Sequence, residues 1–186
     1  MKKYNVFVLS GFGRVERSYN ELVETAPENT KVHVVPYTQL PLNIGTIAQD
    51  VNNSLRRLEV TSAHFVGHSL GGIVGMQLAV LTPECMQSLT LIDSAGIPIS
   101  KRKLIEAALA QSVLQFPLLK AKENIRAVGR VFHHPIRSWK ALSYSAQADL
   151  EAISKAITVP TYILWGAKDK TTPLSVGERL HETIPN

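Results

Sequence analysis

Short apolar segments alternate along the chain with longer segments in which apolar residues recur at helical spacing. The apolar segments cover residues 4–9, 31–35, 63–66, 88–92 and 161–165. Each is nearly continuous in apolar character, which is typical of parallel strands covered on both faces. Helical periodicity marks residues 15–25, 44–58, 69–81 and 174–183. Because strands and helices alternate, the pattern predicts an α/β fold with a doubly wound, mostly parallel sheet.

The alternation stops between the fourth and fifth predicted strands. Residues 97–159 show helical periodicity without a convincing strand, and Pro117 bends the strongly apolar first half of this segment. We therefore expect an α/β core of residues 1–96 and 160–186 and a helical cap of residues 97–159. Such an insertion above the carboxyl ends of the strands would act as a lid on a ligand pocket. The pattern also fits an ordinary packed helical subdomain, and the two interpretations are compatible.

Length and composition exclude several classes of protein. A chain of 186 residues suits one domain with an insertion better than two independent domains. The only cysteine, Cys85, excludes an internal disulfide and a cysteine-based zinc site. No apolar stretch is long enough to span a membrane, and Met1 leads into a predicted strand instead of a signal peptide. We expect a soluble, cytoplasmic protein without stable membrane insertion.

The formal net charge of +5 is unevenly distributed. Residues 100–140 hold nine basic residues against Glu106 and Glu123, and nine minus two gives this segment a charge of +7. The remainder of the chain is slightly acidic, so a general affinity for nucleic acid is not indicated. The segment could attract anionic substrates or lipid head groups locally. A solvated helix face is the preferred interpretation, because charged runs usually serve solubility.

A serine lies in the setting that a strand-to-helix nucleophile turn requires. Residues 67–72 read Gly-His-Ser-Leu-Gly-Gly, directly after a predicted strand and before a predicted helix. A nucleophile on such a sharp turn has strained backbone angles, so small residues are needed two positions before and after it, here Gly67 and Gly71. The turn also aims the Leu70 N–H and the helix dipole at any oxyanion formed on Ser69. The motif predicts acyl-transfer chemistry at Ser69.

The loop after the first predicted strand offers a second oxyanion donor. It reads Ser-Gly-Phe-Gly over residues 10–13, and the backbone N–H of Phe12 is the candidate. The same glycines could begin a dinucleotide fingerprint. However, Glu16 stands where the third glycine belongs, and the second strand ends at Pro36 without an acidic ribose ligand. We therefore expect no nicotinamide or flavin, and the sequence implies no other cofactor and no metal.

Two aspartates follow predicted strands and could orient a histidine. Asp169 lies on the loop after the fifth strand, and Asp93 follows the fourth. A carboxylate at the carboxyl end of a strand can hold a histidine and stabilise the imidazolium that forms when the histidine takes the serine proton. Aspartates also form turns in many loops, so neither residue is decisive alone.

These segments together resemble the α/β-hydrolase fold superfamily, in its branch of lidded esterases, C–C hydrolases and cofactor-free haloperoxidases. The resemblance covers nearly all 186 residues and is carried by the surroundings of Ser69, by residues 92–96 and by residues 164–169. It implies that Ser69 is the nucleophile and Asp169 the acid of a catalytic triad, whereas Asp93 matches a frequent position outside the triad.

The resemblance also assigns the oxyanion hole to the N–H groups of Phe12 and Leu70. One departure lies in the first loop, where Ser10 occupies the position of the family's usual histidine. That histidine supports the geometry of the loop, so its replacement is tolerable.

A second departure concerns the general base. The family places its histidine well downstream of the acid, after one further strand, and this chain ends seventeen residues after Asp169. By the resemblance, the last strand, the histidine loop and the closing helix have no counterpart. A serine without a base is a poor nucleophile, and triad variants lose on the order of a million-fold in rate. We therefore expect a nearly inert chain, as a truncated form of a longer protein or as a degenerate relative.

The six histidines of the chain occupy positions that do not require a catalytic role. They lie on predicted strands, in the turn before the serine, in the predicted cap and on the last predicted helix. They are His33 and His64, His68, His133 and His134, and His181, in that order. No convincing substitute for the base is found among them.

The sequence thus predicts a serine hydrolase that acts on carboxylic esters or related acyl or C–C bonds through an acyl-serine intermediate. Its expected partner is a small hydrophobic, ester-like substrate. The alternative is a non-catalytic binding or signalling module that keeps the fold and has lost turnover. The intact motif around Ser69 favours the enzyme, whereas the missing histidine favours the module.

Overall fold

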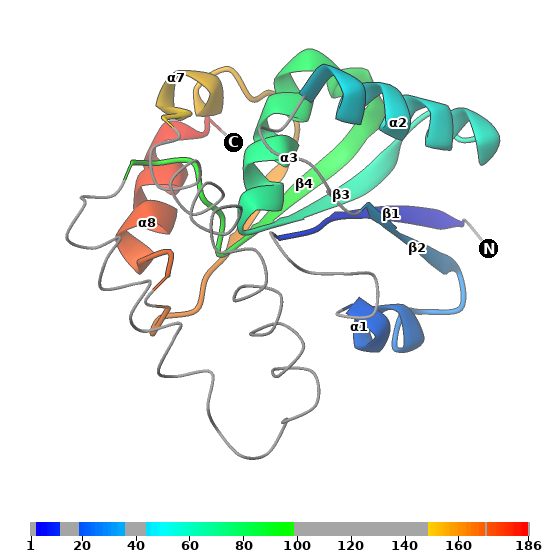
Figure 1. Ribbon diagram of the computed structural model, residues 1–186, viewed down its shortest axis with the longest axis horizontal. Helices are drawn as coiled ribbons and strands as arrows, with labels where there is room; N and C mark the ends of the chain where they lie inside the picture. The colour runs from blue at the N-terminus through cyan, green and yellow to red at the C-terminus, as the bar shows by residue number, and fades with distance from the viewer. Residues whose placement is uncertain (1–2, 12–18, 36–43, 99–148, 170, 186) are drawn as a thin grey trace, which may run out of the picture.

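The computed structural model of the chain describes residues 3–11, 19–35, 44–98, 149–169 and 171–185. Within these ranges, five parallel strands form one sheet in the order β2-β1-β3-β4-β5 (Figure 1). The strands are β1 (Tyr4–Leu9), β2 (Thr30–Val35), β3 (Ala63–His68), β4 (Met86–Ile92) and β5 (Thr161–Leu164). All four neighbouring pairs run parallel. The predicted α/β fold with a mostly parallel sheet is confirmed.

Helices connect the strands. They are α1 (Asn20–Glu24), α2 (Ile44–Arg57), α3 (Leu70–Leu81), the 3-10 turn η2 (Pro83–Cys85), α7 (Glu151–Ser154) and α8 (Leu174–Thr183). The predicted helices over residues 44–58, 69–81 and 174–183 agree with α2, α3 and α8 to within one residue at each end. The first predicted helix, residues 15–25, is described only from residue 19 onward. In Figure 1, α2 and α3 lie over one face of the sheet and α1 lies on the other side.

The core forms where α3 packs on the central strands. The helix is apolar around its whole circumference, and most of its residues are buried. Ile73 and Met76 from α3 meet Phe65 of β3 and Leu89 of β4 in one cluster of buried side chains. Gly75 lets the helix approach the sheet closely, because a Cβ atom there would lie 2.9 Å from Leu89 Cδ1. This packing fixes the amino end of α3 at the carboxyl end of β3.

One face of the described sheet is only partly covered near its β5 edge. Tyr162 is 62% exposed and Leu164 56% exposed, although both are large apolar residues of a strand. They pair in register with Thr90 and Ile92 of β4, which are partly buried. Leu89 points toward α3, so alternation along β4 and β5 places these four side chains on the sheet face opposite α3.

The described end of the predicted cap segment packs against the α/β core. Leu150 and Ile157 belong to the buried cluster, and the Leu150 N–H donates to Gly96 O at 2.8 Å. Residues 99–148, which include the basic segment and most of the predicted cap, lie outside the described residues. The division into a core and a cap therefore stays a prediction.

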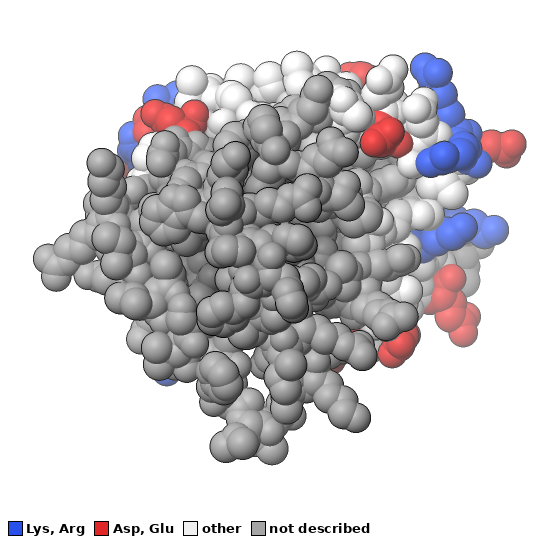
Figure 2. All heavy atoms as spheres, viewed as in Figure 1, with Lys and Arg blue, Asp and Glu red and all other residues white. Residues whose placement is uncertain are grey.

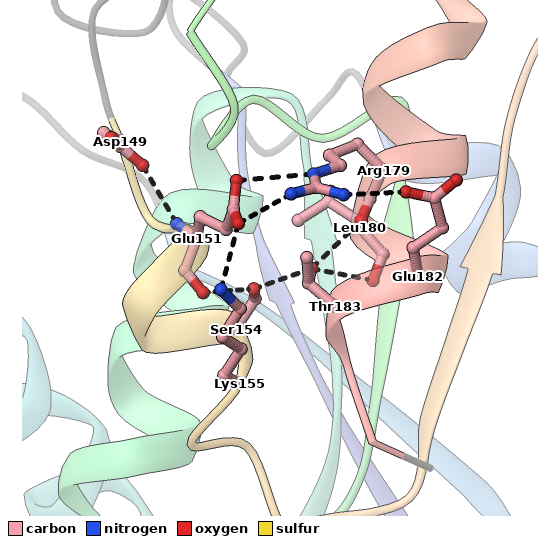
Figure 3. Close-up of polar contacts among 8 residues, drawn as sticks. All are labelled: Asp149, Glu151, Ser154, Lys155, Arg179, Leu180, Glu182 and Thr183. Atoms are coloured by element: carbon pink, nitrogen blue, oxygen red, sulfur yellow. Dashed lines mark hydrogen bonds and ion pairs between the residues drawn. The ribbon is translucent and has the colours of Figure 1, made fainter.

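Helices α7 and α8 are joined by polar contacts between their side chains (Figure 3). Glu151 accepts hydrogen bonds from Arg179 Nη2 at 2.7 Å and from Lys155 Nζ at 3.0 Å. Beneath them, the buried Ser154 hydroxyl lies 2.8 Å from Thr183 Oγ1. The exposed ion pairs and the buried hydroxyl pair hold the last helix against the described end of the predicted cap segment.

The surface of the described residues carries charges of both signs. On the face shown in Figure 2, lysines and arginines lie beside aspartates and glutamates. Among the described residues, no helix has the length and apolar character needed to cross a membrane.

Candidate active site

Ser69 occupies the turn between β3 and α3, and its backbone is strained. Its φ of 53° and ψ of −118° lie in a region that residues with a side chain seldom adopt, at a cost on the order of 1–3 kcal/mol. Hydrogen bonds of the surrounding structure hold this conformation. The Ser69 N–H donates to Ile92 O at 3.0 Å, and Ser69 O accepts from the N–H of Gly72 at 3.0 Å and of Ala95 at 3.2 Å. The arrangement has the backbone strain that a nucleophile turn requires.

The side chain of Ser69 makes no capping hydrogen bond to α3, the helix that follows. Ser69 stands at the N-cap position of α3, where a serine hydroxyl commonly accepts a hydrogen bond from the first turn, yet it makes no such bond. The residue is only partly buried. Its hydroxyl therefore sits at the carboxyl edge of the sheet, next to the amino end of a buried helix.

Gly67 and Gly71, the two glycines singled out in the sequence, lie where other backbone atoms come closest to the turn. A Cβ atom at Gly67 would lie 2.8 Å from Gly71 O and 2.8 Å from Gly72 Cα. A Cβ atom at Gly71 would collide with the backbone carbonyl of Leu9 at the end of β1. Neither position has room for a side chain, which agrees with the steric reason for predicting glycine there.

Of the two predicted oxyanion donors, only one lies among the described residues. Leu70 is the first residue of α3, so its N–H has no acceptor within the helix, and its side chain is buried at 1% exposure. The positive end of the helix dipole reinforces this N–H as a donor toward negative charge. Phe12 lies outside the described residues.

The chain immediately before Phe12 is described and is held against the turn. The Gly11 N–H donates to the Tyr19 hydroxyl at 3.1 Å, and the same hydroxyl lies 3.4 Å from His68 Nδ1. The Tyr19 and His68 rings meet edge to face, with centroids 6.4 Å apart. Tyr19 is not among the residues predicted from the sequence. In the sequence, Tyr19 is only a tyrosine that follows shortly after the loop of residues 10–13. Such a tyrosine is too common to indicate a role by itself.

Asp169 lies on the loop after β5 and is ordered by that loop. Its Oδ1 accepts from the N–H groups of Thr171 at 2.6 Å and Thr172 at 3.1 Å, and its Oδ2 accepts from the Thr172 hydroxyl at 3.1 Å. The Asp169 N–H in turn donates to Gly166 O at 2.9 Å. The carboxylate is partly buried and closes a compact turn.

Asp93 connects the turn of Ser69 with the loop of Asp169. It directly follows Ile92, whose carbonyl accepts the Ser69 N–H, and its own Oδ1 accepts from the Gly166 N–H at 2.7 Å. Its φ of 44° is positive, a conformation that aspartate tolerates better than most residues. The structure thus brings Ser69, Asp93 and Asp169 to the carboxyl ends of the adjacent strands β3, β4 and β5.

The described histidines other than His68 lie in the sheet or on the last helix. His33 Nε2 lies 3.0 Å from Asn5 Oδ1, and its ring stacks on Phe7. Burial lowers the pKa of His33, and the Lys31 ammonium lowers it further. His64 Nδ1 lies 2.8 Å from the Ser88 hydroxyl, near the start of β3 and therefore at the end opposite Ser69. His181 is exposed on α8, and His133 and His134 lie outside the described residues.

Comparison with known proteins gives relatives that are named as hydrolases. The chain is 28% identical over 165 residues to a putative carbamate hydrolase RutD of Stutzerimonas stutzeri. The alignment covers 77% of this chain and 62% of that protein. It is 26% identical over 211 residues to a pimeloyl-[acyl-carrier protein] methyl ester esterase of Neisseria meningitidis, which covers 96% of this chain and 80% of the esterase. The chain thus spans about six tenths of the length of the RutD relative.

Solved structures share the fold at low sequence identity. A mutant form of the meta-cleavage product hydrolase CumD superposes with a TM-score of 0.76 at 18% identity and covers 98% of this chain and 80% of that one. A bromoperoxidase from Bacillus anthracis superposes with a TM-score of 0.73 at 17% identity, covering 100% and 82% respectively. The family model described as alpha/beta hydrolase fold matches residues 11–124, which is more than half of the sequence. The chain belongs to the alpha/beta hydrolase fold family.

Proposed function

We propose that this protein is a serine hydrolase that cleaves carboxylic esters, or related acyl or C–C bonds, through an acyl-serine intermediate with Ser69 as nucleophile. The observation that carries the proposal is the strained backbone of Ser69, at φ 53° and ψ −118°, at the amino end of α3. Strain of this kind persists only where the surroundings enforce it, and it concentrates at sites where the geometry serves chemistry. At Ser69, which is only partly buried, the hydroxyl makes no capping hydrogen bond to the first turn of α3.

In the first step, Ser69 Oγ attacks the carbonyl carbon and its proton passes to a general base. The carbonyl oxygen becomes an oxyanion, which the N–H groups of Leu70 and Phe12 stabilise together with the dipole of α3. The intermediate collapses as the base returns the proton to the leaving alkoxide. A water molecule then repeats the sequence on the acyl-serine, which releases the acid and regenerates the Ser69 hydroxyl.

In this proposal Asp169 orients the base. Its carboxylate is fixed by the hydrogen bonds from Thr171 and Thr172, so it is held in place before a histidine binds. Asp93 Oδ1 accepts a hydrogen bond from the Gly166 N–H and thereby stabilises the loop that carries Asp169. The assignment of the acid to Asp169 rests on the resemblance of residues 164–169 to the family.

The proposal assigns the base to none of the described histidines, which are His33, His64, His68 and His181. The only histidine after Asp169 in the sequence is His181, which is exposed on the last turn of α8. Without a positioned base, turnover by this chain is weak, by on the order of 10⁴- to 10⁶-fold relative to a complete triad. A small base in solution can replace a missing side chain in part, since the step needs only a proton acceptor of suitable pKa near Ser69.

The names of the relatives support an acyl substrate. One relative is named as a methyl ester esterase and another as a putative carbamate hydrolase. Esters and carbamates both contain an acyl carbonyl group. The proposed substrate is a small hydrophobic ester, in keeping with the apolar character of the predicted cap in the sequence.

The proposal is tested by ester hydrolysis with imidazole as the external base. The chain is assayed on p-nitrophenyl acetate, butyrate and octanoate over a range of imidazole concentrations, beside Ser69→Ala in the same buffers. Imidazole cleaves these esters by itself, and the Ser69→Ala variant measures that background. The expected result is a saturable rate above the background that rises with imidazole and is lost in Ser69→Ala. Equal rates for the two proteins at every imidazole concentration would overturn the proposal.

A further inference from the structure

We infer that Thr172 is a positioning residue, whose hydroxyl fixes the Asp169 carboxylate relative to the turn of Ser69. The inference deepens the proposed function and rests on it, since the place of this carboxylate matters only if Asp169 orients a base for Ser69. Thr172 precedes Pro173 on the loop that leads from β5 into α8, and it is buried at 9% exposure.

The Thr172 hydroxyl joins two groups from different parts of the chain. Its Oγ1 lies 3.0 Å from Asp93 O and 3.1 Å from Asp169 Oδ2. A carbonyl oxygen and an ionised carboxylate can only accept hydrogen bonds, so these two acceptors share the single proton of the hydroxyl. The contact with Asp93 spans 79 positions of the sequence and ties the loop of Asp169 to the end of β4.

The two carboxylate oxygens of Asp169 are held differently. Oδ1 accepts from the N–H groups of Thr171 at 2.6 Å and of Thr172 at 3.1 Å. Among the described residues, Oδ2 has one hydrogen-bond partner, the Thr172 hydroxyl. A carboxylate oxygen accepts about two hydrogen bonds, so Oδ2 has capacity left for the ring N–H of a base. The Thr172 hydroxyl therefore sets the place of the oxygen that would hold the base.

The other partner of the hydroxyl belongs to the strand end that also holds Ser69. Asp93 directly follows Ile92, whose carbonyl oxygen accepts the Ser69 N–H at 3.0 Å. The carbonyl oxygens of two consecutive residues thus bind the nucleophile turn and Thr172. Because both hydrogen bonds are made by the same short piece of backbone, the Thr172 hydroxyl fixes the loop of Asp169 relative to Ser69.

The backbone of Thr172 is held separately, by the indole of Trp165. Trp165 Nε1 donates to Thr172 O at 2.8 Å. The Trp165 ring packs in turn against α8, because a Cβ atom at Gly177 would lie 2.6 Å from Trp165 Cε3. The backbone of Thr172 therefore keeps this attachment when the hydroxyl alone is removed.

Loss of the hydroxyl should affect the base and not the ester. Without its partner, Asp169 Oδ2 is free to move as the carboxylate turns about the Cβ–Cγ bond. A misplaced carboxylate holds the base less well in the transition state, whereas binding of the ester does not involve Asp169. With imidazole as the external base, more imidazole should be needed for the half-maximal rate, and KM for the ester should not change.

The test compares Thr172→Val with Thr172→Ser and Thr82→Val. Valine has nearly the shape of threonine without the hydroxyl, and serine keeps the hydroxyl. Thr82 Oγ1 donates to Leu78 O at 3.1 Å at the end of α3 opposite Ser69, so Thr82→Val removes a similar hydroxyl at another place. Circular dichroism and the urea midpoint establish that the variants are folded. Thr172→Ala, which also lacks the hydroxyl, replaces Thr172→Val if the latter does not fold.

The first readout is the carboxyl carbon resonance of Asp169 in protein labelled with ¹³C-aspartate. Its absence from the spectrum of Asp169→Asn assigns this resonance. The resonance should move in Thr172→Val, because Oδ2 loses its hydrogen bond. It should stay close to its wild-type position in Thr172→Ser and in Thr82→Val.

The second readout is the Ser69-dependent hydrolysis of p-nitrophenyl acetate with imidazole. Thr172→Val should lower the rate at saturating ester about 10-fold, with KM for the ester within about twofold. Thr172→Ser and Thr82→Val should match the wild type. Added to Asp169→Asn, Thr172→Val should change the rate by less than about twofold, because the hydroxyl acts through the carboxylate.

The outcomes separate the inference from the proposed function. The inference is wrong if the Asp169 resonance stays in place in Thr172→Val, if that variant keeps the wild-type rate, or if its loss is equally large beside Asp169→Asn. In each case Ser69 remains the nucleophile. If the wild type has no Ser69-dependent rate, the proposed function fails, and a positioning role for Thr172 in it fails too. The Asp169 resonance then still reports whether the hydrogen bond exists.

Discussion

Asp93 Oδ1 accepts a hydrogen bond from the Gly166 N–H at 2.7 Å, across 73 positions of the sequence. The bond ties the end of β4 to the loop after β5. Thr172 strengthens the same junction, because its hydroxyl lies 3.0 Å from Asp93 O and 3.1 Å from Asp169 Oδ2. Asp93 and Asp169 are thus parts of one hydrogen-bonded junction at the carboxyl ends of β4 and β5.

This junction predicts how Asp93 variants differ in stability. Asp93→Ala removes the acceptor of Gly166 and places alanine at a φ of 44°, so we expect a loss of about 1–3 kcal/mol in the free energy of unfolding. Asp93→Asn keeps an oxygen acceptor and tolerates the positive φ, and it should lose less than about 1 kcal/mol. Urea denaturation measures both variants. Equal stabilities of the alanine and asparagine variants would contradict the role assigned to this hydrogen bond.

The close approach of α3 to the chain after β4 gives a steric prediction. A Cβ atom at Gly72 would collide with Ser94 Oγ, and both residues are buried. Gly72→Ala should therefore destabilise the fold by about 1–3 kcal/mol, as overpacked core positions do. Adding Ser94→Gly removes the colliding atoms and should recover part of the loss.

Gly166→Ala is the control for this experiment. A Cβ atom there would meet its nearest neighbour, Asp93 Oδ1, at 3.6 Å, which is an ordinary contact. Its free energy of unfolding should change by less than about 1 kcal/mol. A Gly72→Ala variant as stable as Gly166→Ala would show that α3 does not approach Ser94 this closely.

The ion pairs between α7 and α8 predict a pH dependence of stability (Figure 3). Hydrogen bonds from Lys155 and then Arg179 lower the pKa of Glu151 below the usual range of a glutamate. A carboxyl whose pKa is lower in the folded than in the unfolded chain stabilises the fold above its unfolded pKa. That contribution is lost as the pH falls through the folded pKa.

The matched comparison is Glu151→Gln against Glu178→Gln on the exposed surface of α8. Between about pH 5 and pH 3, the melting temperature of the wild type and of Glu178→Gln should fall more steeply than that of Glu151→Gln. High salt should reduce the difference, because the pairs are exposed and screened. Parallel melting curves for all three proteins would mean that Glu151 does not contribute.

The sheet and the long helices could be predicted because their patterns are local. The strands β1 to β5 are nearly continuous apolar segments, and α8 follows Pro173 with a clear helical period over residues 174–183. The turn at Ser69 is equally local, since its glycines, strand and helix are consecutive. The short helix α7 is not predicted as an element, because four residues are too few to show a period.

Contacts between distant parts of the chain could not be predicted in the same way. The hydrogen bond from Gly166 to Asp93 depends on β4 and β5 being neighbours, and the contact of Tyr19 with His68 depends on how α1 enters the fold. Neither contact has a signal in the sequence, even though Asp93 and His68 are noted there for other reasons. Phe12 and most of the predicted cap lie outside the described residues, and their roles stay predictions.

The central claim is that the Ser69 hydroxyl is a nucleophile, and reaction with a fluorophosphonate probe tests it most directly. The chain is incubated with the probe and imidazole, digested with trypsin and analysed by mass spectrometry, beside Ser69→Ala. We predict a single phosphonyl adduct on the peptide that contains Ser69, and none on that peptide in the variant. An adduct that forms elsewhere at the same rate in both proteins, or no adduct in the wild type, would contradict the claim.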